Sequence, residues 1–333
     1  MATDSEERLT MSASDRKVKV GVVGVGYLGR YHAMKYNQLP NADLVGVVDV
    51  DRQVAERVAK ELSTIPYNDY LQFIDKVDAV SIAVPTKDHH SVAMDFLKNG
   101  VDVLVEKPIT KTIDQADELV KLAGEKKAIL QVGHLERFNA AVMALEDTID
   151  EPMFIESHRL APFKERGTDI DVILDLMIHD IDIILSLVGS EVVTINAVGV
   201  PVISDKVDIA NARITFKSGC VANVTSSRIT TEQTRKIRIF QRNAYVSLDY
   251  ANQKIIFCKR VEEEGLSRPR IDYEEINVTK KDALEEELGA FIGSVISRKE
   301  PVVTGSDGRM ALDVALKVQK EAREWEGMSK IFS

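Results

Sequence analysis

A glycine-rich turn between two apolar runs is the feature that most limits the fold of this 333-residue chain. Residues 17–23 have the sequence KVKVGVV, a mostly β-branched stretch that suits a buried parallel strand, and GVGYLG follows at 24–29. A helix is expected over 27–36, directly after the glycines. This order of strand, turn and helix predicts the start of a dinucleotide-binding sheet.

Each glycine of the motif has its own steric purpose. We expect Gly24 to allow the tight turn, Gly26 to let the backbone approach a pyrophosphate, and Gly29 to let the helix pack closely on the strand. Tyr27 and Leu28 begin the helix, whose free N–H groups and positive dipole end favour phosphate. An ordinary strand-turn-helix without a ligand is the alternative.

An acidic residue follows the second expected strand, which covers 44–48. Asp49 comes about twenty residues after the last glycine, the spacing of the residue that bonds the adenosine ribose 2′-hydroxyl in dinucleotide-binding folds. A carboxylate there repels a 2′-phosphate, so NAD is favoured over NADP as the cofactor. Arg52 offers a way to accommodate a phosphate, although Asp51 beside it weakens that alternative.

Strand and helix patterns alternate up to about residue 135, which predicts a doubly wound parallel sheet. The further expected strands are 79–84, 102–105 and 128–132, and the further expected helices are 51–62, 91–99 and 113–126. Ligands bind at the carboxyl ends of the strands in such sheets. Polar groups follow three strands at that edge, at Pro85-Thr86, Glu106-Lys107-Pro108 and Gly133-His134.

The pattern changes after Phe138 to one long helix and many extended segments, which predicts an α+β domain with a mainly antiparallel sheet. We therefore divide the chain into a mobile tail at 1–16, an NAD-binding Rossmann domain at 17–137 and a substrate-binding and oligomerisation domain at 138–333. An apolar outer sheet face would need a partner subunit, so a homo-oligomer, a dimer or a tetramer, is expected.

Composition excludes several classes of protein. The formal net charge of −10 argues against a general nucleic-acid binder, and two cysteines, Cys220 and Cys258, indicate neither a disulfide framework nor a cysteine-rich zinc site. No stretch is long and apolar enough to span a bilayer, and residues 1–16 lack the apolar segment of a signal peptide. A cytoplasmic protein is expected.

Taken together, the motifs resemble the Gfo/Idh/MocA oxidoreductases, whose founding members act on sugars, inositols and related polyols. The resemblance extends from about residue 18 to about residue 325. Its markers are GVGYLG at 24–29, VPTKDHH at 84–90, EKP at 106–108 and DLMIHD at 175–180. The combination is far more specific than any one of the four motifs.

The resemblance implies that Lys107, Asp175 and His179 form the catalytic group. Oxidation of a secondary alcohol moves a hydride to the nicotinamide while the hydroxyl proton leaves, so a base such as His179 must lie nearby. Lys107 can stabilise developing alkoxide charge or share the proton, and in this family the bond before Pro108 is commonly cis. Asp175 lies one helical turn before His179, so that both can face a substrate hydroxyl.

Each of these residues also has an interpretation without a catalytic role. Lys107 can be a solvated lysine at a strand end, and Asp175 with His179 can be a helix-surface pair. A metal site is conceivable because Asp182 follows His179 at i, i+3 spacing, but no further ligand cluster supports it, and no metal is expected.

The cofactor is expected to contact Gly24, Gly26, Tyr27, Leu28, Gly29, Asp49, Pro85, Thr86, His89, Glu106 and Lys107, and the substrate His134, Arg137, Arg159, Arg166, Asp175 and His179. Some of these positions have equally plain alternatives: His89 can simply belong to the next helix, His134 and Arg137 can form a packing or hinge motif, and the loop of Arg166 can be solvated.

The segments GHLERFN, HRLAPF and LDLMIHDID resemble the nucleotide-sugar branch of the family, the UDP-N-acetylglucosamine 3-dehydrogenases in particular. That resemblance implies oxidation of the sugar 3-hydroxyl to a 3-keto product, which an aminotransferase partner can convert to a 3-amino sugar for lipid A, in lipopolysaccharide biosynthesis, or for other surface glycans. Two alternatives stay open: a dehydrogenase of another nucleotide sugar or of a free polyol or inositol, and a non-catalytic, NAD-sensing regulator on the same fold.

Overall fold

The computed structural model describes residues 17–145, 148–163, 170–263 and 268–329, and the side chains to 325. The expected tail at 1–16 lies outside the described residues. The chain forms two compact units. The first comprises the chain up to Leu135 together with Leu284–Arg309, and the second comprises Glu136–Ala283 together with the chain from Met310 onward. Each unit has its own sheet, and each is described by itself below.

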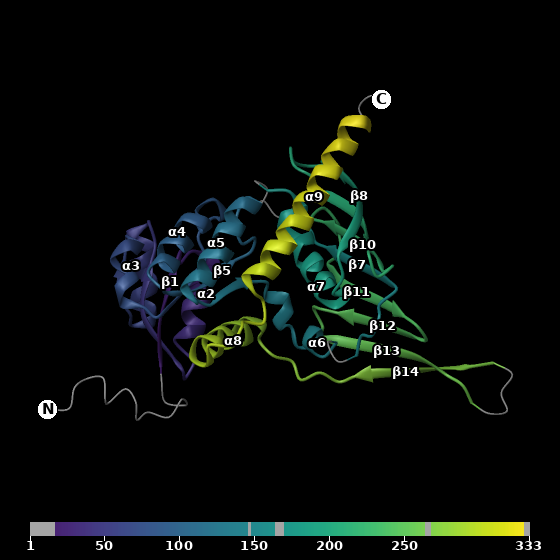
Figure 1. Cartoon of the computed structure of the whole chain (residues 1–333), viewed down its shortest axis with the longest axis horizontal. Helices are drawn as coiled ribbons and strands as arrows, with labels where there is room; N and C mark the ends of the chain where they lie inside the picture. Colours follow the sequence, from purple (N-terminus) through teal and green to yellow (C-terminus); the bar gives the residue numbers. More distant parts are fainter. Residues whose placement is uncertain (1–16, 146–147, 164–169, 264–267, 330–333) are drawn as a thin grey trace. The chain divides into compact units, whose positions relative to one another are not determined.

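The first unit contains a six-stranded parallel sheet with the order β3-β2-β1-β4-β5-β6. Figure 1 labels β1 and β5 of this sheet. Its strands are β1 (Val18–Val23), β2 (Ala42–Val48), β3 (Pro66–Tyr67), β4 (Ala79–Ile82), β5 (Asp102–Glu106) and β6 (Leu130–Gly133). The chain winds one way from β1 to β3 and the other way from β4 to β6. The switch point between β1 and β4 is where doubly wound folds bind their ligands.

Helices connect these strands, and N-terminal capping explains where two of them begin. They are α2 (Tyr27–Tyr36), α3 (Arg52–Leu62), α4 (Thr86–Lys98) and α5 (Ile113–Lys126). Asp51 caps α3 by accepting the N–H groups of Gln53 and Val54, and Thr112 caps α5 by accepting the N–H of Gln115. These two N-caps fix where α3 and α5 begin.

One further helix of the first unit comes from far along the sequence. In α8 (Ala283–Ser297), Leu288, Phe291, Ile292 and Val295 are buried in one apolar cluster with side chains of β1, β2, α2 and α3. We assigned 284–309 to the second domain from sequence, and the contact pattern places it in the first unit instead. The physical reason is this apolar stripe, which repeats at helical spacing and packs on the Rossmann core.

The second unit contains an eight-stranded sheet with the order β14-β13-β12-β11-β7-β10-β9-β8. Its strands are β7 (Phe154–Leu160), β8 (Val192–Val200), β9 (Ile209–Phe216), β10 (Val221–Ser227), β11 (Thr234–Gln241), β12 (Ala244–Asp249), β13 (Lys254–Val261) and β14 (Arg270–Ile276). The strands pair antiparallel except β7 with β10.

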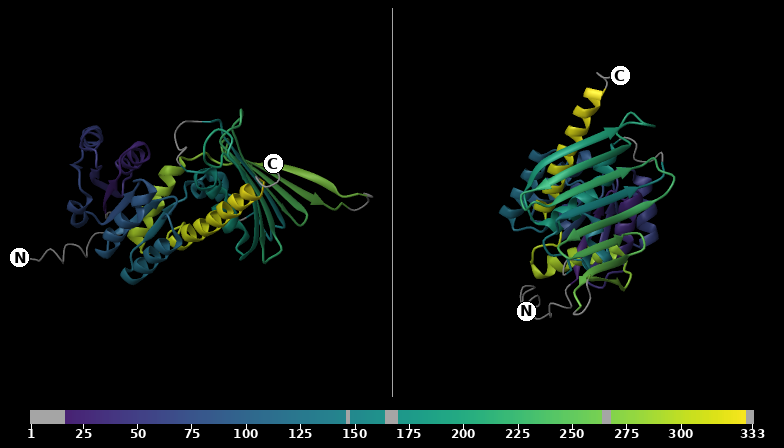
Figure 2. Two further views of the ribbon diagram at one scale, coloured as in Figure 1. Left: turned by 90° about the horizontal axis from the view of Figure 1, so that it is seen from above. Right: turned by 90° about the vertical axis from the view of Figure 1, so that its right-hand side faces the viewer.

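Helices cover one face of this sheet. The helix α7 (Ile178–Val188) and the part of α9 (Gly305–Ser329) from Met310 onward bury apolar side chains against alternate residues of the strands (Figure 2). In β7 the burial alternates strictly, as expected for a sheet with one covered face. A short helix, α6 (Ala140–Met143), completes this unit.

The α/β fold class is therefore confirmed: a Rossmann sheet is followed by an α+β unit with a mainly antiparallel sheet. Within the described part of the chain, no helix combines the length and the apolar character needed to cross a membrane.

Candidate functional site

The glycine-rich turn has the geometry that its sequence predicts. Gly24 has φ +85°, and a Cβ there would lie 2.8 Å from the backbone of Ala83 and Val84. A Cβ on Gly29 would overlap the carbonyl oxygen of Gly24, so close packing of helix on strand requires glycine at 29. Around Gly26 no atom lies within 4 Å of the Cβ position, which leaves space for a ligand at the start of α2.

A cavity of about 650 Å³ opens beside this turn. Its lining comes from the carboxyl ends of β1, β2 and β4 and includes Gly24, Gly26, Asp49 and Pro85. The cavity thus lies at the switch point of the sheet, and it is within the size range of small-molecule and cofactor sites. Tyr27, which is largely exposed, and Leu28 stand in the first turn of α2.

Asp49 connects the second strand to the glycine turn. Its Oδ2 accepts the N–H of Val25 at 2.9 Å, and its Oδ1 accepts the N–H of Asp51 at 3.0 Å. Arg52 is turned to Glu56 through an Nε–Oε1 bond of 2.7 Å. The acid lines the cavity while the arginine is paired on α3, an arrangement that fits an adenosine ribose with a free 2′-hydroxyl.

His89 joins two of the predicted strand-end motifs. It is buried on α4, with Nδ1 2.9 Å from the carbonyl oxygen of Pro108 and Nε2 2.9 Å from that of Val84. Burial lowers its pKa in spite of these carbonyl contacts. The contact of His89 with the cofactor stays a prediction. The geometry supports a role in holding the turn at Lys107-Pro108, whose peptide bond is cis, as the family resemblance implied. Thr86 is the first residue of α4.

Glu106 belongs to a buried polar cluster that sequence reasoning missed. Its Oε1 lies 3.2 Å from Nε2 of His32, and its Oε2 accepts the N–H of Lys107 at 3.3 Å. Nδ1 of His32 lies 2.8 Å from Oγ of Ser81, and a carboxylate oxygen of Glu287 is within 4.8 Å of both the histidine and Glu106. His32 could have been found from the sequence, because it follows the glycine motif by three residues. Glu287 could not, because nothing distinguishes it within a run of glutamates.

Asp175 and His179 lie at the start of the helix that covers the second sheet. Asp175 is in a π-helical turn, Ile173–Met177, and His179 is in the first turn of α7. Both side chains are half-buried. We expected an ordinary α-helical turn between them; the wider turn keeps the i, i+4 pair on one side, and such π segments are frequent at functional sites. Asp171 caps the segment by accepting the N–H of Leu174 at 3.1 Å.

Arg159 is buried and fully engaged by acids of its own unit. Its Nε donates to Oδ2 of Asp180 at 2.6 Å, its Nη1 donates to Oε1 of Glu136 at 2.9 Å, and its guanidinium lies 5.3 Å from the ring centre of Tyr250. Although burial opposes it, the two carboxylates hold the pKa of Arg159 above its usual value. This environment favours a structural role beside His179 over direct contact with a substrate.

The remaining predicted substrate residues are distributed over both units. His134 follows β6 in the first unit and Arg137 lies in the second; both are buried. Arg166 lies outside the described residues. The cofactor candidates and Lys107 belong to the first unit, whereas Asp175 and His179 belong to the second. Their meeting in one active site therefore remains a proposal.

Comparison with known proteins agrees with this geometry. Residues 18–134 match the model of an oxidoreductase family with an NAD-binding Rossmann fold, and residues 145–247 match the GFO/IDH/MocA C-terminal domain. The chain is 39% identical over 303 residues to a UDP-N-acetylglucosamine 3-dehydrogenase of Acidithiobacillus ferrooxidans, covering 91% of this chain and 96% of that one. A myo-inositol 2-dehydrogenase of Thermotoga maritima is 25% identical, with 92% and 97% covered.

Solved structures show the same relationship. A structure of the A. ferrooxidans UDP-N-acetylglucosamine 3-dehydrogenase superposes with a TM-score of 0.87 at 38% identity, covering 92% of this chain and 97% of that one. The apo scyllo-inositol dehydrogenase of Lactobacillus casei shares the fold, with a TM-score of 0.78 at 20% identity and coverage of 93% and 97%.

Proposed function

The chain belongs to the Gfo/Idh/MocA family of NAD-binding oxidoreductases, and from that premise we propose that it oxidises the 3-hydroxyl of UDP-N-acetylglucosamine to a 3-keto sugar. The observation that carries this proposal is the 39% identity to a UDP-N-acetylglucosamine 3-dehydrogenase through both units. Relatives named as inositol dehydrogenases are more distant, at 25–28% identity where they match over 91–92% of the chain.

The first unit fits NAD. The cavity at the switch point, the open space over Gly26 and the carboxylate of Asp49 supply a phosphate position and a ribose position in the order that a dinucleotide requires. NAD, when bound, accepts the hydride that leaves C3 of the sugar. The chain itself must then bind the sugar, orient its 3-hydroxyl and take the hydroxyl proton.

We assign the proton transfer to His179 and Lys107. As the C–H bond at C3 breaks with its electron pair, the hydroxyl proton passes to the imidazole of His179 and the C=O bond of the ketone forms. The ammonium of Lys107 stabilises the negative charge that develops on the oxygen, and Asp175 accepts a hydrogen bond from a neighbouring sugar hydroxyl. The half-buried position of all three side chains suits groups that contact a bound substrate.

The proposal extends to the cellular setting. A 3-keto sugar is the substrate that an aminotransferase needs to form a 3-amino sugar, so we place the enzyme in the cytoplasm before such a step in lipopolysaccharide or other surface-glycan synthesis.

We also propose a homo-oligomer formed through the outer face of the second sheet. On that face Phe240 lies 5.7 Å from Phe154 and 4.8 Å from Tyr245, measured between ring centres.

The experiment that tests the function is NADH formation, followed by absorbance, when the purified chain is mixed with NAD and UDP-N-acetylglucosamine and coupled to an aminotransferase that removes the keto product. Lys107→Ala should lower kcat by about a hundredfold or more because it removes a group used in the transition state. Lys111→Ala, at an exposed position four residues on, is the matched control and should retain the rate.

No NADH with UDP-N-acetylglucosamine, together with turnover of another nucleotide sugar or of an inositol, would transfer the activity to that substrate. Tight NAD binding without turnover of any of these substrates would instead support the NAD-sensing regulator.

A further inference from the structure

The cluster of His32, Glu106 and Glu287 places two carboxyl groups together in the interior of the first unit. The three residues come from α2, the end of β5 and α8, and one nitrogen or oxygen of each lies within 4.8 Å of the others. His32 and Glu287 are 0% exposed and Glu106 is 8% exposed. Two carboxylates this close in a buried site cannot both be ionised, because neither water nor distance screens their repulsion.

The contacts of the two carboxyl groups are unequal. Glu106 faces Nε2 of His32 at 3.2 Å and accepts the N–H of Lys107, and its carboxylate fills the space beside Gly133, where a Cβ would lie 2.8 Å from Oε1. Glu287 has no hydrogen-bond partner for either oxygen within the described residues. Donors therefore stabilise the charge on Glu106, whereas an ionised Glu287 would be buried without compensation.

We infer that Glu106 and Glu287 hold one proton between them, that this proton stays on Glu287, and that the ionised Glu106 so maintained fixes the turn that presents Lys107. The tautomer of His32 follows: the proton is on Nε2, which faces the carboxylate of Glu106 at 3.2 Å, and Nδ1 accepts the hydroxyl hydrogen of Ser81. Glu287 is thus a positioning residue that acts through Glu106. The effect of Glu287 on turnover rests on the proposed function, whereas the inference that Glu287 carries the proton does not depend on that function.

The directions of the pKa shifts agree with this assignment. Burial first, and the neighbouring Glu106 second, raise the pKa of Glu287 well above its ordinary value. Burial also opposes ionisation of Glu106, but its hydrogen bond and charge interaction with His32, together with the charge of Lys107, lower its pKa. The titratable groups that face the pair are His32 and Tyr36 on α2, His89 on α4 and Lys107 after β5.

A metal ion is the rival occupant, since one histidine and two glutamates are a usable ligand set. The proton explanation is favoured because Glu106 already lies 3.2 Å from Nε2 of His32 and accepts the N–H of Lys107, so that a single proton is sufficient to neutralise the remaining carboxylate.

The test compares the full-length Glu287→Gln and Glu106→Gln variants with Glu285→Gln, which removes an exposed carboxylate of the same helix that pairs with Lys35 at 3.0 Å. A raised folded pKa means that the folded protein binds the extra proton above about pH 4.5, so wild-type stability falls as the pH rises. The glutamine of Glu287→Gln does not titrate, so this pH-dependent loss is absent from the variant. Its Tm should therefore increase relative to wild type between pH 5 and pH 8, by about 2 °C or more.

Turnover gives the second readout. Glu287→Gln should keep kcat and the KM for NAD within about twofold, because glutamine replaces a carboxyl that is already neutral, whereas Glu106→Gln should lower kcat at least about tenfold with a smaller change in KM. Glu285→Gln should show no pH-dependent difference in Tm. A Tm difference for Glu287→Gln that is constant with pH would overturn the inference.

Two other results would also overturn it: loss of kcat in Glu287→Gln as large as in Glu106→Gln, or elemental analysis that finds one metal ion per wild-type chain and none in Glu287→Gln. The Tm measurement needs no substrate. It therefore tests the proton even if UDP-N-acetylglucosamine proves not to be the substrate.

Discussion

Asp49 has one role that the structure shows, a contact within the glycine turn, and a second that we propose, a contact with the cofactor. Its carboxylate accepts the N–H of Val25 in the glycine turn and also lines the cavity that fits NAD. The first contact needs an oxygen acceptor, whereas discrimination against NADP needs the negative charge. An asparagine can keep one oxygen for the N–H of Val25 and removes the charge, at the loss of the hydrogen bond to the N–H of Asp51. The two roles can therefore be separated by one substitution.

Asp49→Asn should therefore lower the ratio of kcat/KM for NAD to that for NADP by about tenfold or more, while the Tm of the unliganded protein changes little. The measurement is initial-rate kinetics with both cofactors. Asp51→Asn is the control, since it keeps an oxygen that can cap α3 and lies outside the lining of the cavity. An unchanged cofactor ratio in Asp49→Asn would remove this residue from the selection of NAD.

Arg159 differs from Asp49 because its charge is paired with carboxylates of the protein itself. Asp180 and Glu136 are both within 3 Å of its nitrogens, and all three side chains are largely buried. Loss of the arginine therefore leaves Asp180 without its counter-charge and leaves Glu136 with Arg235 alone, at 3.8 Å. Arg159→Met should lower the free energy of unfolding by about 3–5 kcal/mol. Arg238→Met, which breaks a partly exposed pair with Glu156, should cost about 1 kcal/mol or less.

Chemical denaturation of the two methionine variants measures both effects. Equal losses of stability in Arg159→Met and Arg238→Met would contradict the structural role of Arg159. It would then return to the group of expected substrate residues.

At this scale the sequence predicted the residues whose chemistry has a fixed spacing and missed those whose role depends on burial. Gly24, Gly29 and Asp49 could be assigned because a dinucleotide turn imposes their order. Arg159 was expected to face a substrate because nothing in HRLAPF shows that Asp180 and Glu136 enclose it. Glu287 was missed because its partners on α2 and β5 are remote in sequence.

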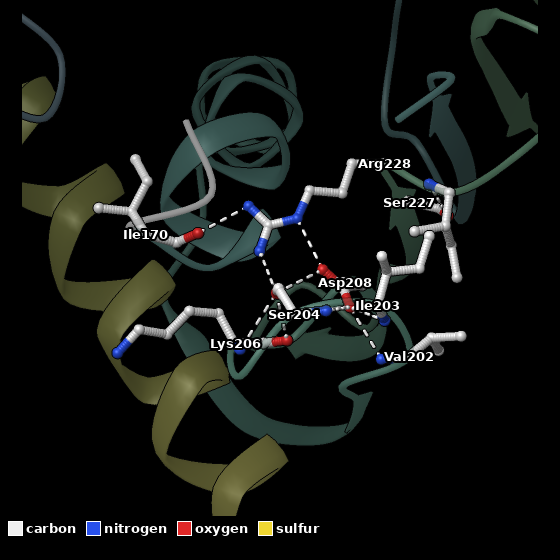
Figure 3. Close-up of polar contacts among 9 residues, drawn as sticks. Ile170, Val202, Ile203, Ser204, Lys206, Asp208, Ser227 and Arg228 are labelled. Carbon is white, nitrogen blue, oxygen red and sulfur yellow. Dashed lines mark hydrogen bonds and ion pairs between the residues drawn. The ribbon is translucent and has the colours of Figure 1, made fainter. Parts of the chain in front are cut away.

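Among the elements, the loop between β8 and β9 is held by one buried ion pair. Figure 3 shows Asp208 accepting the N–H groups of Val202, Ile203 and Ser204 at 2.7–2.9 Å while Arg228 bonds its other oxygen at 2.8 Å. Arg228 also donates to the carbonyl oxygen of Ile170 at 2.7 Å. The loop is thereby fastened to the segment that leads into the π-helical turn of Asp175.

Asp208→Asn should lower the free energy of unfolding at pH 7 by about 2–4 kcal/mol, because Arg228 loses its buried counter-charge. Burial alone would raise the pKa of Asp208, but the three N–H groups and Arg228 hold it well below its ordinary value. Its stabilisation is therefore complete above about pH 4 and is lost as the pH falls further.

Denaturation at a series of pH values checks both the size and the sign of this effect. The gap between wild type and Asp208→Asn should narrow only below about pH 4. Glu191→Gln, which breaks the exposed pair with Lys217, should change the unfolding free energy by about 0.5 kcal/mol or less at every pH. A gap for Asp208→Asn that narrows above pH 5 would contradict the assigned pKa direction.

The elements themselves were largely predictable, and their partners were not. Period-two and period-3.6 patterns located the strands of the first sheet except β3, and they predicted a mainly antiparallel second sheet. The helix expected over 91–99 begins earlier, at Thr86. The same patterns could not show that α8 packs with β1 and β2, since an apolar stripe specifies burial but not the surface that buries it. The π-helical turn at Asp175 likewise has no sequence signature of its own.

For the whole molecule, the division into two units separates cofactor recognition from the residues proposed to bind the sugar. The chain passes between the units after Leu135, after Ala283 and after Arg309, so three connections join two separate cores. The cavity that fits NAD is lined only by the first unit. NAD should therefore bind and stabilise the protein without any sugar present.

At a concentration of about 100 times its Kd, NAD should stabilise the folded protein by about 2.7 kcal/mol and raise the Tm by roughly 5 °C or more. UDP-N-acetylglucosamine added to the NAD complex should raise the Tm further. Free N-acetylglucosamine and myo-inositol at the same concentration should leave it unchanged, since they lack the nucleotide that distinguishes the proposed substrate class. Thermal unfolding followed by calorimetry measures all four conditions on one preparation. A rise with myo-inositol but not with the UDP-sugar would assign the chain to the chemistry of its more distant inositol relatives.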